Sequence, residues 1–320
     1  MKITYPAPFK HGLILILALI AVLVATLSPK IELRRDIRNY LFIVDITQSM
    51  NVQDMLLNGS KASRIAYARR LLSETVKGLP CGTKISVGLF ADSSVDVLYT
   101  PIEVCSNFDV IQNTLAHLEW RMAWHGGSRL RLGMQSASSL MLTLKDPAQL
   151  VFLTDGDEAP PINAISKTDL TTLQNSSGWL LVGLGANAPS PIPKLDANNQ
   201  VIGYWSQYAT KMDAVSAESR GTRDDSIADS PSEYYLSALN QPYLMEMAKD
   251  LGARYVRADD AEHLLAAIGK LPAAGHDKIQ VDIAWIFALL AGSLIIADHH
   301  LGRDQTRRRN QNPLHHEIAR

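Results

Sequence analysis

Oxygen-bearing side chains lie at the ends of two apolar segments of the sequence. Asp45 ends the run LFIVD, and Thr47 and Ser49 follow it at alternate positions. Asp155 ends a second apolar run, QLVFLTD. Alternate positions of an extended loop can point the same way, and in open α/β sheets ligands bind beyond the carboxyl ends of the strands. We therefore expect these four side chains to belong to one site. Taken alone, Asp45 would be interpreted as a helix cap or a turn residue.

A third hydroxyl completes this set of oxygen ligands. Ser128 follows Gly126 and Gly127 and precedes a predicted helix, so it lies on a flexible approach. Two carboxylates and three hydroxyls suit a hard cation, with Mg²⁺ as the first expectation and Mn²⁺ or Ca²⁺ as alternatives. No set of His and Cys accompanies them, which disfavours zinc. The phosphate-binding motif GxxxxGKS/T is absent from the sequence.

The segments around these residues alternate between strand and helix patterns. Continuous apolar runs predict buried strands, and apolar residues spaced three and four apart predict helices with one buried face. This alternation is typical of an α/β fold with a doubly wound, mostly parallel sheet. The predicted strands cover 41–45, 149–155, 178–185 and 254–258, and the predicted helices cover 63–77, 107–119, 129–143, 241–251 and 260–270.

Two segments depart from that alternation. Residues 84–100 alternate like two strands around a turn at about 92–94, which predicts one antiparallel edge hairpin. Such a hairpin places Cys81 and Cys105 opposite each other beyond its open end, where a disulfide can form; two unrelated core cysteines are the alternative. Residues 186–240 are rich in Ser, Asp, Asn and Pro, so we expect an extended insertion there rather than a second domain.

In this order, Asp45-x-Thr47-x-Ser49, Ser128 and Asp155 resemble the metal-ion-dependent adhesion site (MIDAS) of a von Willebrand factor A (VWA) domain, over roughly residues 38–270. The resemblance implies a Rossmann-like sheet in which the hydroxyls bind the cation directly and the aspartates act mostly through water. It also implies that a protein partner supplies a carboxylate to the metal. Thr47 stands where Ser is usual and Ser128 where Thr is usual, and both keep the hydroxyl.

A closer similarity is to membrane-anchored VWA proteins of the Bat type. It rests on the stretches DITQSMNVQDM, GLGANAPSPIPKLDANNQVIG and LNQPYLMEMAKDLGARYVRADD. This resemblance implies an accessory or assembly factor that works with a MoxR-type AAA+ ATPase and other VWA proteins. Related proteins occur with methanol dehydrogenase maturation systems, so a maturation factor of a periplasmic dehydrogenase is the alternative.

Apolar segments without charged residues lie near both ends of the chain. We expect a membrane anchor over 12–28 after an N-terminal tail of residues 1–11, with a cleaved signal peptide or a core helix as alternatives. We expect a second transmembrane helix over 281–298 before a basic tail, 299–320, with a core helix as the alternative. The net charge of −1 indicates no nucleic-acid partner.

The charges beside the two apolar segments conflict over orientation. Arginines of the C-terminal tail favour cytoplasmic termini, whereas Lys30, Arg34, Arg35 and Arg38 favour the opposite arrangement. Because long domains translocate largely regardless of charge, we give the tail more weight. We therefore expect a bacterial inner-membrane protein with a periplasmic domain and cytoplasmic termini. A disulfide agrees with that location, since it needs an oxidising compartment.

We do not expect an enzyme, because no Ser or Cys has the context of a nucleophile. The enzyme alternative is a Mg²⁺-dependent phosphatase with Asp45 as nucleophile, and a further alternative is a membrane scaffold with a vestigial site. Several further residues flank the site. Asp54 recurs in the Bat-type pattern and is a weak candidate, and Asp157 and Glu158 either tune the local charge or contact a partner. The group Trp120, Trp124 and His125 forms either a binding surface or part of the core.

Overall fold

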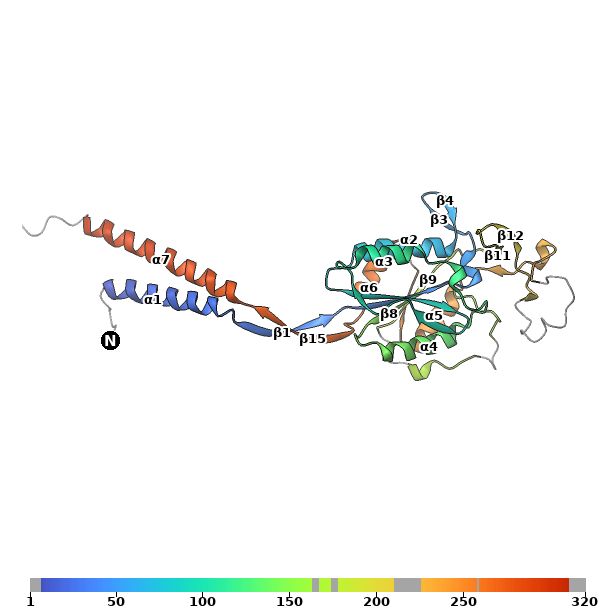
Figure 1. Ribbon diagram of the computed structural model, residues 1–320, viewed down its shortest axis with the longest axis horizontal. Coiled ribbons are helices and arrows are strands. Elements are labelled where there is room, and N and C mark those ends of the chain that lie inside the picture. The colour runs from blue at the N-terminus through green and yellow to red at the C-terminus, as the bar shows by residue number, and fades with distance from the viewer. Residues whose placement is uncertain (1–6, 163–166, 174–177, 210–225, 258, 311–320) are drawn as a thin grey trace, which may run out of the picture. The chain divides into compact units, whose positions relative to one another are not determined.

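The structure is a computed structural model that describes residues 7–162, 167–173, 178–209, 226–257 and 259–310 (Figure 1). It contains two compact units. The larger unit is Asp36–Gly275 and contains the sheet and the predicted site. The smaller unit brings together the two ends of the chain, Met1–Arg35 and His276–Arg320.

A seven-stranded mixed sheet forms the centre of the larger unit within the described residues. Its strands follow the order β14-β9-β8-β2-β5-β6, and β7 also pairs with β5. Neighbours from β14 to β5 are parallel, whereas β6 and β7 run antiparallel to β5. The strands are β2 (Tyr40–Asp45), β5 (Lys84–Ala91), β6 (Ser94–Val97), β7 (Ile102–Glu103), β8 (Gln149–Thr154), β9 (Leu180–Gly183) and β14 (Arg254–Arg257).

Helices cover both faces of this sheet (Figure 1). On one face lie α2 (Arg64–Lys77), α3 (Phe108–Ala116) and α6 (Ala261–Gly269), whose apolar side chains share one core cluster with the strands. On the other face lie α4 (Leu130–Thr143) and α5 (Gln241–Leu251), which contribute to a second cluster. Burial on both faces explains why the central strands are continuously apolar rather than alternating.

The pairing register brings the two predicted acidic strand ends together. Every residue of β2 is buried, and β2 lies between β5 and β8. Val44 pairs with Leu153 of β8, and Asp45 pairs with Phe90 of β5. Because the strands are parallel, Asp45 and Asp155 leave the sheet at the same edge.

Small hairpins surround that edge. β3 (Met55–Leu57) and β4 (Ser60–Ala62) form one hairpin between β2 and α2. The described part of residues 186–240, which we call the insertion, contains β10 (Ser190–Pro191) paired with β13 (Leu236–Ser237). It also contains β11 (Pro193–Leu195) paired with β12 (Val201–Tyr204). The insertion is therefore a set of short ribbons and not a second core.

The smaller unit contains two helices and most of a two-stranded ribbon. α1 (Ala7–Thr26) packs against α7 (Ala284–Asn310), and β1 (Lys30–Ile37) pairs with β15 (Gly275–Asp282). Within the described residues one helical stretch, Ala284–Leu301, is long and apolar enough to cross a membrane. The apolar stretch of α1, Gly12–Thr26, is shorter than that limit.

The fold prediction is correct in class and differs in detail. Ser63 caps α2 as expected, since its hydroxyl accepts a hydrogen bond from Ala66 N. The predicted second membrane segment, 281–298, begins too early because its first two residues still belong to β15. The C-terminal tail, 299–320, continues α7 as far as Asn310, and 311–320 lie outside the described residues. The β1–β15 ribbon and the β3–β4 hairpin were not predicted.

Candidate metal centre and binding pocket

Asp45 closes β2 and organises the loop that follows it. Thr47 donates two hydrogen bonds to Asp45 Oδ1, from its backbone N at 2.9 Å and from Oγ1 at 2.7 Å. Thr154 at the end of β8 donates Oγ1–H to Asp45 Oδ2 at 2.6 Å. The Asp45 side chain is fully buried. Three donors therefore fix its carboxylate and, through it, the position of Thr47.

Ser49 lies in the short 3-10 helix Gln48–Asn51, directly after Thr47. Its Oγ is 3.3 Å from Thr47 Oγ1. Because Thr47 gives its only hydroxyl hydrogen to Asp45, Ser49 is the donor in this contact. Both hydroxyl oxygens keep lone pairs that are able to accept a further donor or to bind a cation.

The loop that contains Ser128 is attached to the turn between β5 and β6. Asp92 N donates to Gly127 O at 2.9 Å, and Arg129 N donates to Asp92 O. A Cβ atom on Gly127 would lie 2.4 Å from Asp92 Oδ1, so a larger residue there would displace the Asp92 side chain or the loop. Ser128 Oγ in turn donates to Asp157 O at 2.7 Å, which joins the loop to the segment after β8.

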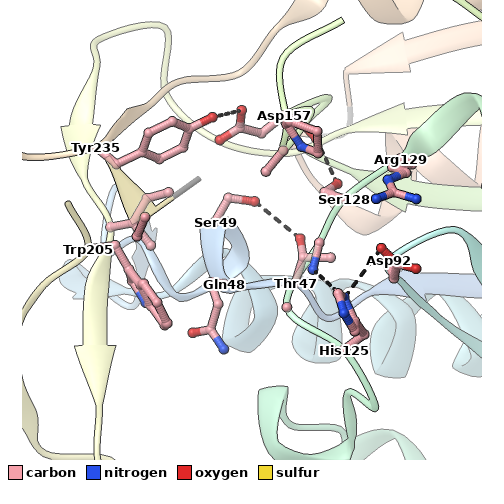
Figure 2. Close-up of a pocket in the computed structure, with 16 residues that line it drawn as sticks. Thr47, Gln48, Ser49, Asp92, His125, Ser128, Arg129, Asp157, Trp205 and Tyr235 are labelled. Atoms are coloured by element: carbon pink, nitrogen blue, oxygen red, sulfur yellow. Dashed lines mark hydrogen bonds and ion pairs between the residues drawn. The ribbon is translucent and has the colours of Figure 1, made fainter. Parts of the chain in front are cut away.

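Three hydroxyls from these loops line one cavity of about 340 Å³ (Figure 2). The lining includes Thr47, Ser49 and Ser128, and also Ile192, Trp205 and Tyr235 of the insertion. We call these last three residues the insertion wall. Figure 2 shows Trp205 and Tyr235 across the cavity from Thr47 and Ser128. Asp45 and Asp155 are not among the described lining residues, because both are fully buried behind the hydroxyls.

Asp155 follows β8 and meets a buried cation of the protein itself. Its Oδ1 accepts a hydrogen bond from Asp157 N at 2.9 Å, and its Oδ2 accepts one from Arg64 Nη1 at 2.6 Å. Arg64 is the first residue of α2 and also pairs with Asp54, with Nη2 2.7 Å from Asp54 Oδ2. Both Arg64 and Asp155 have side chains with 0% exposure.

The comparison with protein families decides what this domain is. Residues 40–158, from β2 to just past Asp155, match the von Willebrand factor type A domain. The chain carries a VWA domain. The match covers the part of the sequence that contains all five predicted site residues.

Two solved structures are similar to this chain. BatB from Bacteroides thetaiotaomicron is 19% identical, with a TM-score of 0.51, and the alignment covers 73% of this chain and 96% of BatB. An aerotolerance-related membrane protein from Bacteroides fragilis is 18% identical, with a TM-score of 0.49 and coverage of 73% and 98%. No curated protein matches the sequence. At this identity the likeness to BatB concerns the VWA-type fold.

The VWA domain brings all five predicted residues to one edge of its sheet. Thr47, Ser49 and Ser128 expose hydroxyls to the cavity, and Asp45 and Asp155 lie behind them. Arg64 was not predicted, because an arginine at a helix start carries no sequence signal of burial. Asp54, a weak candidate from the sequence, is the acid that pairs with Arg64.

The electrostatics of the edge are dominated by buried acids. Burial, together with the nearby charge of Asp155, raises the pKa of Asp45 to about 7. Burial and Asp155 likewise raise the pKa of Asp157 to about 6. Although burial opposes its charge, the pKa of Arg64 is raised by Asp155 and Asp54. One guanidinium thus faces several carboxylates, and the edge has an excess of negative charge.

These residues fit a divalent cation. The donor set consists of hydroxyl and carboxylate oxygens, the ligands that hard cations prefer. Asp157 Oδ2 is buried and has no hydrogen-bond partner among the described residues. A cation held by Thr47, Ser49 and Ser128, with the buried aspartates behind, would supply the positive charge that this edge lacks.

The other flanking residues divide between the pocket and the surface. His125 lines the cavity, with Nδ1 3.4 Å from Asp92 Oδ1. Trp124 is 45% exposed, and Trp120 donates Nε1–H to Asn199 of the insertion at 2.8 Å. Glu158 accepts a hydrogen bond from Tyr243 at 2.6 Å, and burial raises its pKa to about 7. Trp124 therefore lies at the surface, and Trp120 contacts the insertion.

Cys81 and Cys105 form a disulfide with a Cα–Cα distance of 5.3 Å. The strand register explains this pairing, because Lys84 of β5 pairs with Glu103 of β7 just inside it. Gly82 N and Ser106 N each donate to the Glu103 carboxylate at 2.6 Å. These hydrogen bonds lower the pKa of Glu103 to about 2.

Proposed function

We propose that this VWA domain binds a divalent cation, Mg²⁺ in the first place and Mn²⁺ or Ca²⁺ as alternatives, at a MIDAS. Thr47, Ser49 and Ser128 hold the ion with their hydroxyls, and Asp45 and Asp155 act mostly through water. When bound, the cation offers an open coordination position to a carboxylate of a protein partner. The domain acts in this proposal as a metal-dependent binding module and not as an enzyme.

The observation that carries the proposal is the division of the site into two layers. Residues with hydroxyls from two separate loops line one cavity, while the carboxylates of Asp45 and Asp155 are fully buried and do not line it. A site for catalysis by Asp45 would need its carboxylate open to substrate. Instead both of its oxygens accept hydrogen bonds, from Thr47 and Thr154, so the geometry does not favour the phosphatase alternative.

The cavity also supports binding of a protein segment. The insertion wall offers apolar and aromatic surface a short way from the hydroxyls, and Lys194 Nζ lies 5.0 Å from the ring centre of Trp205. A partner residue that reaches the cation with its carboxylate would place its neighbours against this wall. Metal and wall together would therefore select the partner.

The proposed cellular role is assembly or maturation at the bacterial inner membrane. α7 supplies a stretch able to span a membrane, and α1 is the second proposed anchor. The disulfide supports a periplasmic location of the domain with cytoplasmic termini. The proposed partners are a MoxR-type AAA+ ATPase and other VWA proteins, or a periplasmic dehydrogenase of the methanol-dehydrogenase type.

A pull-down from membranes with the full chain as bait tests the metal-dependent mechanism. Wild type is compared in Mg²⁺ and in EDTA, alongside Asp45→Ala in Mg²⁺. We expect a partner that is recovered with wild type in Mg²⁺ and lost in the two other arms. Equal recovery in all three would remove the mechanism.

A further inference from the structure

Arg64 makes a complete set of hydrogen bonds inside the VWA domain. Nε donates to Asp54, and Nη2 donates to Asp54 Oδ2 at 2.7 Å and to Ser237 O at 3.2 Å. Nη1 donates to Asp155 Oδ2 at 2.6 Å and to Ser237 Oγ at 2.8 Å. All five N–H donors of the guanidinium therefore have a partner. A side chain so fully engaged holds its partners at fixed positions.

These partners join the cation site to both ends of the insertion. Asp155 belongs to the proposed metal centre, and Ser237 lies in β13 near the C-terminal end of the insertion. Asp54 Oδ2 also accepts a hydrogen bond from Ala186 N at 3.0 Å, at the N-terminal end of the insertion. One ion pair, Arg64 with Asp54, thus contacts the insertion at both of its ends.

The chain before the insertion is adapted to this contact. Gly185 has φ +119°, and a Cβ on it would lie 2.8 Å from Arg64 Nε. Glycine is the residue that accepts both this backbone conformation and this approach. The close contact with Arg64 is therefore built into the backbone at the start of the insertion.

The Arg64 contact leads directly to the insertion wall. Two residues before Ser237, Tyr235 N donates to Trp205 O at 2.8 Å, which pairs the segments that contain two of the three wall residues. Tyr235 also donates its hydroxyl to Asp157 Oδ1 at 3.1 Å (Figure 2). These hydrogen bonds connect the segment that contains Ser237 to the surface that faces the cavity.

We propose that Arg64 is a positioning residue that couples the cation site to the insertion wall. By holding Asp155 it orients a carboxylate of the metal centre, and by holding Ser237 and Asp54 it fixes the insertion. Cation binding, which orders Asp155, then also orders the wall that a partner meets, and by reciprocity a fixed wall favours cation binding. This inference rests on the proposed function of the site.

Hydrogen exchange and calorimetry on the full chain in detergent test this coupling. Ser237→Ala removes the hydrogen bond from Arg64 and the side-chain hydrogen bond to Asp157, and it changes no proposed metal ligand. In wild type we expect Mg²⁺ to slow amide exchange around Ala186 and over 234–240 by about tenfold. In Ser237→Ala we expect that slowing to be largely lost and Mg²⁺ affinity to fall about fivefold.

Two matched variants separate coupling from general damage. Ser190 lies opposite Ser237 in the β10–β13 pair and makes no hydrogen bond to Arg64 within the described residues, so Ser190→Ala should respond to Mg²⁺ as wild type does. Ser237→Thr keeps the hydroxyl and should restore the response. Wild type that binds Mg²⁺ with no change at the insertion ends, or Ser237→Ala that responds fully, would overturn the coupling alone. Wild type that binds no Mg²⁺ would overturn the proposed function and the coupling with it.

Discussion

Arg64 Nη1 lies 2.6 Å from Asp155 Oδ2, and neither side chain is exposed to solvent. The pair links the start of α2 to the end of β8 across the edge where the proposed cation binds. Removing one partner of such a buried ion pair strongly lowers the free energy of unfolding, because the remaining charge stays in a medium that cannot solvate it. The stability of the domain and the geometry of the site therefore depend on the same contact.

Replacement of Arg64 should destabilise the domain strongly. Arg64→Met leaves Asp155 and Asp54 buried without their cation, and we expect the free energy of unfolding to fall by about 3–5 kcal/mol. The control is Arg70→Met, which removes a partly exposed pair with Glu74 and should change it by less than about 1 kcal/mol. Denaturant unfolding of both variants measures the difference. Equal stability of the two variants would contradict the role assigned to the buried pair.

Removal of one hydroxyl should weaken cation binding without unfolding the domain. Ser128→Ala deletes a proposed direct ligand, and we expect Mg²⁺ affinity measured by calorimetry to fall at least about tenfold. The matched control is Ser139→Ala, which removes an exposed hydroxyl of α4 that donates to Gln135 O. This variant should bind Mg²⁺ with wild-type affinity. If Ser128→Ala kept wild-type affinity, the third hydroxyl would not belong to the metal centre.

Asp45 should make the metal-free protein less stable at high pH. Its folded-state pKa of about 7 exceeds the unfolded value of about 4. The folded chain thus holds this proton more tightly, and stability falls as pH rises from about 4 to 7. In EDTA we therefore expect the Tm of wild type to fall relative to that of Asp45→Asn by about 5 °C as the pH rises from 5 to 8.

The same variant should lose the benefit of the metal. At pH 8 Mg²⁺ should raise the Tm of wild type and leave that of Asp45→Asn unchanged, because the variant lacks the negative charge that favours the cation. Thermal unfolding with and without Mg²⁺ measures both effects. A wild-type Tm that ignores Mg²⁺ and stays constant from pH 5 to pH 8 would contradict the electrostatic account.

The disulfide provides a test of location and of stability. Cys81 and Cys105 close a loop of sequence separation 24, so replacing both with Ser should lower the free energy of unfolding by about 3 kcal/mol. In intact cells a maleimide should label the wild-type chain only after reduction.

Reporter fusions at residue 200 and at the C-terminus should report opposite sides of the membrane. A cytoplasmic signal at residue 200 would contradict the proposed orientation.

The sequence predicted the central fold because local patterns and packing agree there. The run LFIVD is buried on both faces as β2, and the helix stripe Ile65, Ala68, Leu72 and Val76 faces the core. The β1–β15 ribbon escaped prediction because its strands are mostly exposed and lie 238 residues or more apart in sequence, from Ile37 to Gly275. Pairing between such distant segments leaves no local signal.

The sequence predicted which side chains meet at this edge of the sheet, but it missed the residue that supports them. The order of Asp45, Thr47, Ser49, Ser128 and Asp155 identified side chains that the parallel register then brings together. Arg64 and the insertion wall could not be found in this way. Their roles come from tertiary contacts, such as Arg64 with Ser237, between residues that no motif connects.

The most direct test of the cation site is diffraction from crystals of the full chain grown with Mn²⁺ and measured at the manganese absorption edge. The account predicts one anomalous peak in the cavity, within coordination distance of the hydroxyl oxygens of Thr47, Ser49 and Ser128. A well-ordered site with no peak there, or a peak bound instead to Asp92 and His125, would contradict it.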